Sequence, residues 1–419
     1  MKVCQLCTFR SGGAGIAAKR IHEAVAGSGV ESRIIYRDDR PGLIPAWRRY
    51  TVCPVSRVLR KTMDLRIDSF DHPGCYGHSE SIFPFASAAS VNALDADVIH
   101  LHWINGDFLS ISELGKIRKP VVWTLHDNWA YCGNEFCTVN FRYRDGYTES
   151  TRPDGEKGPD FSRIVWEHKK NQWRDLHPVF VSPSQWNADR LTESLLFRNV
   201  PCRVIRNPLD LKIFSPGDKT AARRKFGLDP TRLTVLFGAA RTDDPLKGAD
   251  LLSAALQILS QRIPADRLQL LCFGAGKPEI DSPYPIIHAG TVNGDAAMAE
   301  LYRAGDLLVC PSRIDNHPGV CTEAMACGVP AVAFRTAGLP EIITDPDSLA
   351  TPFDPESLAE AIVRTLEKRE SLSLQAREYA EKNCAPALIG AQYRDVYEFA
   401  LKSFSGTSPA SGGSAAQRV

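Results

Sequence analysis

Residues 2–36 read KVCQLCTFRSGGAGIAAKRIHEAVAGSGVESRIIY, and the order of elements in this segment indicates the class of fold. The apolar run at 2–8 predicts a buried strand, and a glycine-rich turn at 10–15 comes directly after it. Residues 16–27 have a helical pattern, and the apolar run at 33–36 predicts the next strand. A strand, a turn, a helix and a second strand in this order are typical of a parallel α/β domain.

The same alternation of strands and helices runs through two blocks of the chain, which are separated near residues 206–208. Further strands are predicted in the first block at 97–102, 120–125 and 178–182, and in the second block at 233–238, 268–274, 306–311 and 329–334. Such short apolar runs are typical of central parallel strands covered on both faces. We therefore expect two doubly wound, Rossmann-like α/β domains that face a central cleft, with ligands at the carboxyl ends of the strands.

The nearly balanced charge of the 419 residues argues against several classes of protein. Fifty Lys and Arg against 49 Asp and Glu give a net charge of +1, so no nucleic-acid partner is expected from overall attraction. The first residues lack the apolar core of a signal peptide, and no apolar run approaches the ~18 residues of a membrane-spanning helix. A cytoplasmic protein is the expectation.

The 12 cysteines are scattered along the chain, and we expect no metal site among them. Cys132 and Cys137 are separated by only four residues, but no other Cys or His stands at the spacing of a zinc site. Cys4, Cys272 and Cys310 lie in apolar runs, where cysteine behaves as a small buried hydrophobe.

The strongest chemical signal is DNHPGVCTEAMACGVP at residues 315–330. A polar loop carrying Asp315 follows a predicted strand, and a short helix carrying Glu323 follows the loop. The start of that helix presents free N–H groups and the positive end of the helix dipole, which suit a phosphate; it holds Pro318, Gly319 and Val320. Carboxylates beside a phosphate are better explained as acceptors for sugar hydroxyls. The alternative is that both are ordinary acids at the start of a helix.

These residues resemble the retaining GT-B glycosyltransferases of family 4, above all the bacterial exopolysaccharide and O-antigen type. The family's motif is a Glu, seven residues and a second Glu; here Asp315 takes the first position and Glu323 the second. The resemblance implies that Glu323 hydrogen-bonds the donor's ribose and that Asp315 faces the hexose hydroxyls, although Asp is one methylene shorter than Glu. It extends from residue 1 to about 403 and includes AGLPE at 337–341, which is similar to the family's Gly-Gly-x-x-Glu loop.

Two cations at the start of the second domain match the same family. The segment from Gly238 to Gly248 contains Arg241 and Lys247, and the resemblance implies that both bind the donor's diphosphate. A site for two phosphates without a metal ion needs fixed cations. A lysine at a helix N-terminus opposes the helix dipole, which favours a binding role over a merely solvated cation.

In the first domain, IHLHWING at 99–106 and KPVVWTLHD at 119–127 match the exopolysaccharide-type members. Each is a strand that ends in a polar cluster. The resemblance implies that His126 lies beside the anomeric carbon of the donor sugar. The predicted acceptor-binding residues are Gly15, His102, Trp103, Asn105 and Asp127, and Gly13 is predicted to let the backbone approach the donor. The alternative, histidines that are simply satisfied at strand ends, is the one we adopt for His100.

The resemblance implies a retaining hexosyltransferase that works without a metal or other cofactor. The donor is a nucleotide diphosphate sugar, UDP- or GDP-linked, and the acceptor is a hydroxyl of a glycan or lipid-linked oligosaccharide in surface polysaccharide synthesis. The catalytic residues would be His126, Asp315 and Glu323. The expected domains are 1–205 for the acceptor, 206–385 for the donor, a helix at 386–404 that crosses back to the first domain, and a disordered tail at 405–419.

A basic segment at 46–66, with six Lys and Arg against one acid, is predicted to contact anionic lipid at the inner face of the plasma membrane; the alternative is a solvated protein surface. Three other functions stay open. One is a GT-B nucleotide-sugar epimerase or phosphorylase, another is an NAD-dependent Rossmann oxidoreductase, and the third is a sugar-nucleotide-binding module without activity. The missing acid that would read a ribose after the first glycine-rich turn argues against the oxidoreductase.

Overall fold

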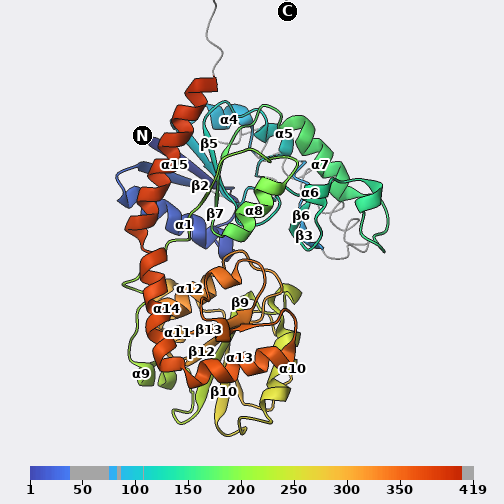
Figure 1. The fold of residues 1–419 in the computed structure, drawn as a ribbon. Helices are drawn as coiled ribbons and strands as arrows, with labels where there is room; N and C mark the ends of the chain where they lie inside the picture. Colours follow the sequence, from blue (N-terminus) through green and yellow to red (C-terminus); the bar gives the residue numbers. More distant parts are fainter. Residues whose placement is uncertain (38–74, 83–85, 107, 408–419) are drawn as a thin grey trace, which may run out of the picture.

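The computed structural model describes residues 1–37, 75–82, 86–106 and 108–407 (Figure 1). The amino-terminal half is built on a six-stranded sheet in which all neighbouring strands are parallel, in the order β2-β1-β4-β5-β7-β8. Its strands are β1 (Lys2–Cys7), β2 (Glu31–Tyr36), β4 (Val98–Leu101), β5 (Val121–Thr124), β7 (Val179–Ser182) and β8 (Cys202–Val204). A separate antiparallel pair is formed by β3 (Cys75–His78) and β6 (Glu135–Thr138).

The carboxy-terminal half repeats this architecture with a second six-stranded parallel sheet, in the order β11-β10-β9-β12-β13-β14. Its strands are β9 (Leu233–Arg241), β10 (Leu268–Ala275), β11 (Ile286–Gly290), β12 (Leu307–Cys310), β13 (Ala331–Phe334) and β14 (Leu349–Ala350). The boundary predicted between residues 205 and 206 falls after β8 and before β9.

Helices connect the strands and cover the sheets (Figure 1). In the first half they are α1 (Gly12–Gly27), α4 (Ala88–Asn92), α5 (Ile111–Leu114), α6 (Arg142–Asp145), α7 (Phe161–Gln172) and α8 (Gln185–Glu193). In the second half they are α9 (Lys219–Lys225), α10 (Ala249–Leu259), α11 (Asp295–Arg303), α12 (Gly319–Ala326), α13 (Pro355–Glu367) and α14 (Arg369–Asn383), before the final helix α15 (Pro386–Thr407). Short 3₁₀ helices lie at η2 (Glu149–Thr151), η3 (Pro245–Lys247), η4 (Leu339–Glu341) and η5 (Pro346–Ser348).

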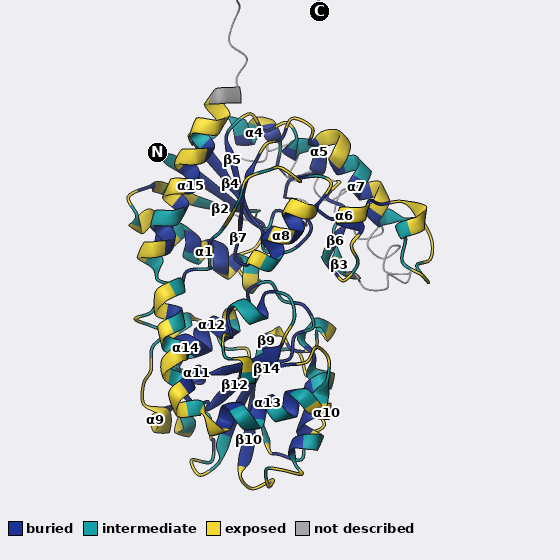
Figure 2. Cartoon of the chain, viewed as in Figure 1, coloured by how far each residue is buried: buried dark blue, intermediate teal, exposed yellow. Residues whose placement is uncertain are grey.

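Both sheets are buried on both faces, as Figure 2 shows by the dark strands at the centre of each half. On β5, Val121 and Trp123 join one apolar cluster while Val122 between them joins another, because successive side chains of a strand point to opposite faces. Leu236 and Phe237 on β9 divide in the same way. The predicted fold class, two doubly wound Rossmann-like domains of GT-B type, is confirmed.

Helix α15 begins in the second half and packs on α1 of the first half (Figure 1). The backbones come so close that a Cβ added at Gly390 would lie 2.2 Å from the carbonyl oxygen of Ala24. Buried His100 on β4 bonds through Nδ1 to the hydroxyl of Tyr397 and through Nε2 to that of Thr124, both at 2.8 Å. His100 therefore anchors this helix to the sheet, which fits the structural role expected for it.

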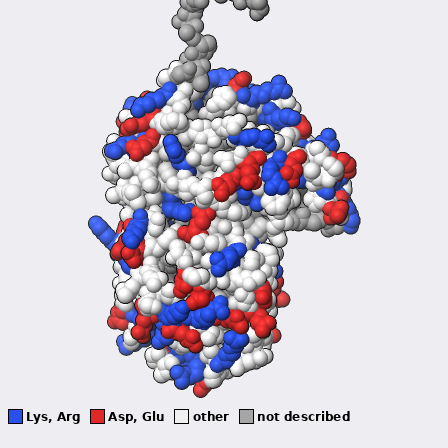
Figure 3. Space-filling model, in the orientation of Figure 1, with Lys and Arg blue, Asp and Glu red and all other residues white. Residues whose placement is uncertain are grey.

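The surface carries both signs of charge side by side, as the face in Figure 3 shows, in keeping with the net charge of +1. No helix among the described residues is long and apolar enough to cross a membrane. The segment 46–66 lies outside the described residues, so its predicted membrane contact stays a prediction. Helix α15 runs to Thr407, three residues into the predicted tail, and the rest of that tail also lies outside the described part of the chain.

Candidate active site

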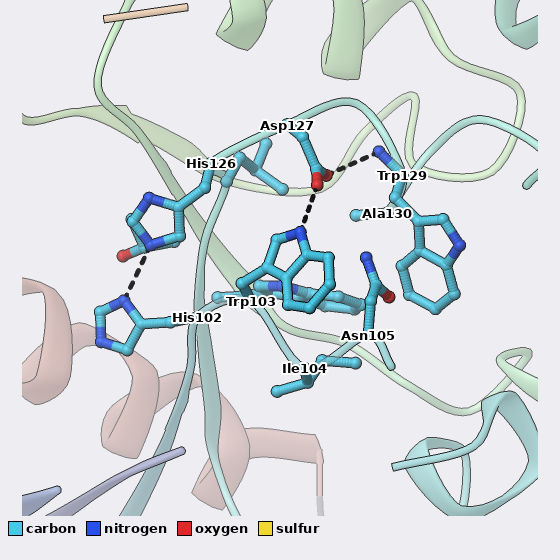
Figure 4. A pocket seen from close by; sticks show the side chains of 11 residues that line it. His102, Trp103, Ile104, Asn105, His126, Asp127, Trp129 and Ala130 are labelled. Carbon is cyan, nitrogen blue, oxygen red and sulfur yellow. Dashed lines mark hydrogen bonds between the residues drawn. The ribbon is translucent and has the colours of Figure 1, made fainter. Parts of the chain in front are cut away.

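Two neighbouring strands of the first sheet end in a group of side chains that we call the strand-end cluster. Its members follow β4 and β5 and line one small pocket (Figure 4): His102, Trp103, Asn105, His126 and Asp127. The structure thus brings together five residues that were predicted from two separate segments. The pocket has a volume of about 10 Å³, about the size of one water molecule, so it is too small to enclose a sugar.

The two histidines of the cluster are in direct contact. His102 Nδ1 lies 3.1 Å from His126 Nε2, and the rings stack with their centroids 5.4 Å apart. Burial lowers the pKa of His126 to about 4 and places the pKa of His102 well below its usual range, where the neighbouring histidines lower it further. At neutral pH both rings are therefore uncharged.

Asp127 is held firmly by its neighbours. Its Oδ2 accepts a hydrogen bond from Trp103 Nε1 at 2.8 Å, and its Oδ1 accepts one from the backbone N–H of Trp129 at 2.9 Å. Burial raises the pKa of the carboxyl to about 6, although both hydrogen bonds act in the opposite direction. Asp127 therefore orients the Trp103 ring, which stacks on Phe9 at the edge of the cluster with centroids 5.3 Å apart.

The backbone after Asp127 is held by Lys169, a fully buried lysine of α7. Its Nζ donates to the carbonyl oxygens of Trp129, Cys132 and Gly133. Lys169→Met is expected to lower the free energy of unfolding by about 3 kcal/mol, because it leaves buried carbonyls without a donor. Urea unfolding measures this, and the exposed neighbour serves as the matched control, since Lys170→Met should change stability by less than about 0.5 kcal/mol. Equal stability of the two variants would contradict this role of Lys169.

In the second half, an ion pair joins two residues that are far apart in the sequence. Lys247 ends η3, one residue before the start of α10, and its Nζ lies 2.8 Å from Asp315 Oδ2 in the loop before α12. The carboxylate of Asp315 raises the pKa of Lys247, so the lysine stays protonated. An ammonium group has three N–H donors, and the contact with Asp315 occupies one of them. Lys247, which is predicted to bind the diphosphate, and Asp315, which is predicted to bind the sugar, are therefore adjacent.

Glu323 on α12 is held at both carboxylate oxygens. Oε1 accepts from Arg20 Nη1 at 2.7 Å, and Oε2 accepts from the hydroxyl of Tyr302 at 2.8 Å. Arg20 belongs to α1 of the first half and also donates to Asp295 Oδ1 at 3.0 Å. Glu323, which is predicted to bind the ribose, therefore lies where the two halves meet. Its partner Arg20 was not among the residues predicted from the sequence.

The sequence contained a signal for Arg20. Ala17, Ile21 and Ala24 are buried on one face of α1, and Arg20 stands among them at helical spacing. A guanidinium on the buried face of a helix needs an acidic partner, because an unpaired buried charge is very costly. The partners, Glu323 and Asp295, lie about 300 residues away in the chain and were beyond the reach of any local pattern.

The remaining predicted donor residues differ in their surroundings. Pro318 and Gly319 start α12, followed by Val320, and a Cβ added at Gly319 would lie 3.4 Å from Glu323 Oε1. Arg241 ends β9 in an ion pair with Asp243, with Nη2 2.7 Å from Oδ2, and its side chain is 70% exposed. Their contacts with a donor stay predictions.

Two glycines of the first turn also differ from each other. A Cβ added at Gly13 would meet no described atom within 4 Å, which leaves its backbone open to approach. A Cβ at Gly15 would lie 2.5 Å from the carbonyl oxygen of Phe9, so tight packing of α1 against the turn requires glycine there. The predicted acceptor contact of Gly15 stays a prediction.

The two groups of residues lie near each other across the two halves. Asn316 beside Asp315 donates to the carbonyl oxygen of Leu125, the residue before His126, at 3.1 Å. Burial raises the pKa of the Cys137 thiol to about 12, and the charges of Asp127 and Asp315 add to this rise. The loop that carries Asp315 therefore contacts the backbone that leads to His126.

Glu341, in the AGLPE loop, also joins the halves. Its two carboxylate oxygens accept hydrogen bonds from the backbone N–H groups of Gln185 and Trp186 at 2.7 Å, at the start of α8. Arg206 Nη1 donates to the same carboxylate at 2.8 Å. A carboxylate at a helix N-terminus is stabilised by the helix dipole, so this loop fixes the second half against the first.

Comparison with protein families gives two matches that follow each other along the chain. The sequence model of the family described as "Glycosyltransferase Family 4" matches residues 11–213. The one described as "Glycosyl transferases group 1" matches residues 232–368. The first match contains the strand-end cluster, and the second contains Lys247, Asp315 and Glu323.

Curated relatives include two proteins named D-inositol 3-phosphate glycosyltransferase. The one from Saccharomonospora viridis is 28% identical over 82% of this chain and 75% of its own length. The one from Segniliparus rotundus is 33% identical over 54% of this chain and 52% of its own length, so the chain spans only about half of it. Neither name mentions exopolysaccharide or O-antigen synthesis, so the predicted subtype is not supported by these relatives.

Solved structures share the fold at low sequence identity. The sucrose-phosphate synthase tll1590 of Thermosynechococcus elongatus is 18% identical with a TM-score of 0.63, over 97% of this chain and 100% of that one. Anabaena Alr3699/HepE, in complex with UDP and glucose, is 16% identical with a TM-score of 0.61, over 95% of this chain and 99% of that one.

Proposed function

The chain belongs to the glycosyltransferases of group 1 and family 4, and from this premise we propose that it is a retaining hexosyltransferase. It moves a hexose from a nucleotide diphosphate sugar to a hydroxyl of a glycan or lipid-linked oligosaccharide, in the synthesis of surface polysaccharide. One observation carries the proposal. The Lys247–Asp315 pair and the buried Glu323 lie in one half, and the strand-end cluster lies in the other, where Asn316 beside Asp315 bonds to the backbone before His126.

The donor would lie mainly against the second half. Glu323 accepts hydrogen bonds from the ribose hydroxyls, and Lys247, with Arg241 and the N–H groups at the start of α12, balances the charge of the diphosphate. Fixed charges aimed at the leaving group are usually the largest source of rate acceleration in such a reaction. UDP is favoured as the nucleotide because the structural neighbour from Anabaena holds UDP and glucose.

Retention is proposed from the resemblance to family 4, through a route on one face of the sugar that needs no nucleophile from the protein. Asp127 is tied to Trp103 and Trp129, Asp315 to Lys247, and Glu323 to Arg20 and Tyr302. Among the described residues of the cleft, each of these carboxylates has a positioning partner, which argues against a free nucleophile. The leaving phosphate itself then takes the proton from the acceptor hydroxyl on the same face of the sugar, while His126 contacts the donor sugar.

The acceptor is tested by supplying both classes that the observations favour. One is a lipid-linked oligosaccharide, and the other is inositol 3-phosphate, which the names of the curated relatives suggest. Release of nucleoside diphosphate that rises with the oligosaccharide alone supports the proposal. A rate that rises with inositol 3-phosphate alone would show that the acceptor is inositol 3-phosphate and not an oligosaccharide, while the proposed donor chemistry would stand.

Sugar transfer is expected to continue in excess EDTA, because Lys247 and Arg241 balance the diphosphate without a metal ion. The measurement is the initial rate with and without EDTA, followed by addition of Mg²⁺ or Mn²⁺. A rate that falls to background in EDTA and returns with the metal would contradict the metal-independent scheme.

The other functions are separated by incubations that omit one component. An epimerase converts the donor when no acceptor is present, and a phosphorylase consumes it with inorganic phosphate. An oxidoreductase changes the fluorescence of NADH. A binding module is stabilised against thermal unfolding by the donor but releases no product. The proposed transferase releases nucleoside diphosphate only when donor and acceptor are both present.

A further inference from the structure

A continuous line of hydrogen bonds crosses the first sheet from helix α1 to the strand-end cluster. We call it the polar chain. His22 Nδ1 lies 2.9 Å from Ser32 Oγ, Gln5 Nε2 donates to Ser32 Oγ at 3.0 Å, and Gln5 Oε1 lies 2.8 Å from His102 Nε2. His102 Nδ1 then lies 3.1 Å from His126 Nε2. The residues come from α1, β2, β1 and the ends of β4 and β5, and these four strands are successive neighbours in the sheet.

The chemistry of the amide at Gln5 fixes the direction of these bonds. Its carbonyl oxygen can only accept, so His102 carries its proton on Nε2. Burial keeps the pKa of His102 low, so its Nδ1 has a lone pair and must accept the hydrogen bond from His126 Nε2–H. At the other end, Ser32 Oγ accepts from the Gln5 amide and also bonds to His22 Nδ1.

The chain ends at His126 Nδ1. With its proton on Nε2 and its pKa lowered to about 4 by burial, the neutral ring has a lone pair on Nδ1. This atom has no hydrogen bond to any described residue, and the ring is partly exposed. Figure 4 shows Nε2 turned toward His102, which leaves the second nitrogen on the opposite side of the ring.

We infer that Gln5 is a positioning residue that fixes the tautomer of His126 through His102, so that His126 presents Nδ1 as a hydrogen-bond acceptor to a hydroxyl in the cleft. Ser32 supports this role because it holds the Gln5 amide in one orientation. A hydroxyl that donates its proton to Nδ1 has a fixed orientation, in which the lone pairs of its oxygen point away from His126. The inference rests on the proposed function for the identity of that hydroxyl, which belongs to the donor sugar or to the acceptor.

The position of Gln5 in the sequence indicates that its side chain has a specific role. It stands in the middle of β1, fully buried between Cys4 and Leu6, where an apolar residue would fold more favourably. A buried amide must be fully hydrogen-bonded to avoid a cost of several kcal/mol. Within the described part of the chain, the Gln5 amide bonds to Ser32 and His102, so the polar chain accounts for its presence.

The tautomer is measured directly by ¹⁵N NMR of the full chain labelled at histidine, with the His126 signals identified by their loss in His126→Asn. The expected wild-type spectrum has a protonated Nε2 and an unprotonated Nδ1. In Gln5→Leu, which has a similar shape, the Nδ1–H form of His126 should appear, and kcat should fall about 10- to 100-fold with the donor Kd changed less than about threefold. Ser32→Ala, at a partly exposed position, should move the spectrum in the same direction by less.

Tyr397→Phe is the matched control, since it removes a buried histidine–hydroxyl bond of the same sheet, to His100, and leaves every hydrogen bond of the polar chain in place. It should leave the His126 spectrum and kcat unchanged. A wild-type His126 with its proton on Nδ1 would overturn the inference, as would Gln5→Leu with an unchanged spectrum. If Gln5→Leu does not fold, an unchanged spectrum in Ser32→Ala overturns it. The spectra need no substrate, so they decide the tautomer even if the proposed transferase activity is absent.

Discussion

Glu323→Ala is expected to lower kcat/KM for sugar transfer by about 10²- to 10⁴-fold while the chain stays folded. Two ribose hydroxyls that donate to a charged carboxylate contribute about 1.5–3 kcal/mol each, and the variant loses both. Initial rates with the best donor measure the effect, and calorimetry of donor binding shows whether affinity falls with the rate. Circular dichroism checks that the fold is kept.

The matched control for Glu323 is the other carboxylate that Arg20 contacts. Asp295→Ala also removes an ion pair of Arg20, at 3.0 Å, but leaves Glu323 in place. Its rate should stay within about threefold of wild type, because partly exposed ion pairs contribute little. Wild-type turnover in Glu323→Ala would contradict the donor assignment. An equal loss in both variants would show that the effect passes through Arg20 and not through the ribose.

Lys247→Met is expected to lower kcat about 10²- to 10³-fold. The methionine keeps the length of the side chain but removes the charge that we propose to face the leaving diphosphate, and loss of one such preorganised group has an effect of this size. The variant also leaves Asp315 without its partner at 2.8 Å, so its carboxylate would repel the diphosphate. Single-turnover rates at saturating donor measure the chemical step.

Lys225→Met provides the control for the lost charge. Lys225 is an exposed lysine of the same half, paired with Glu300 on the surface, and its side chain is 57% exposed. Its removal should leave kcat unchanged, because exposed ion pairs are screened by solvent. If both lysine variants kept wild-type kcat, the role given to Lys247 would be wrong.

The fold could be predicted because it depends on local pattern. Each central strand is a short apolar run. The alternation of these runs with helices in two blocks predicts two parallel sheets without knowledge of any long-range contact. The strand-end cluster was predictable for a related reason. His102 and His126 follow neighbouring parallel strands, and the carboxyl ends of such strands meet at one edge of a sheet.

The contacts that assemble the site could not be predicted, because they join residues with no sequence relation. Arg20 meets Glu323 only when the two halves are packed together, and Lys247 meets Asp315 across 68 positions. Arg20 places a charged group, and Gln5 an amide, at positions that the strand and helix patterns assign to the interior. Such conflicts between residue type and burial are the local sign of a functional contact, but they do not name the partner.

The most direct test of the proposed transfer is the anomeric configuration of the product, followed by ¹H NMR in a reaction of an α-linked nucleotide sugar with a hydroxyl acceptor. We predict an α-linked product, with one nucleoside diphosphate released for each sugar transferred and none released without acceptor. A β-linked product, or donor consumed equally fast without acceptor, would contradict retaining transfer in this cleft.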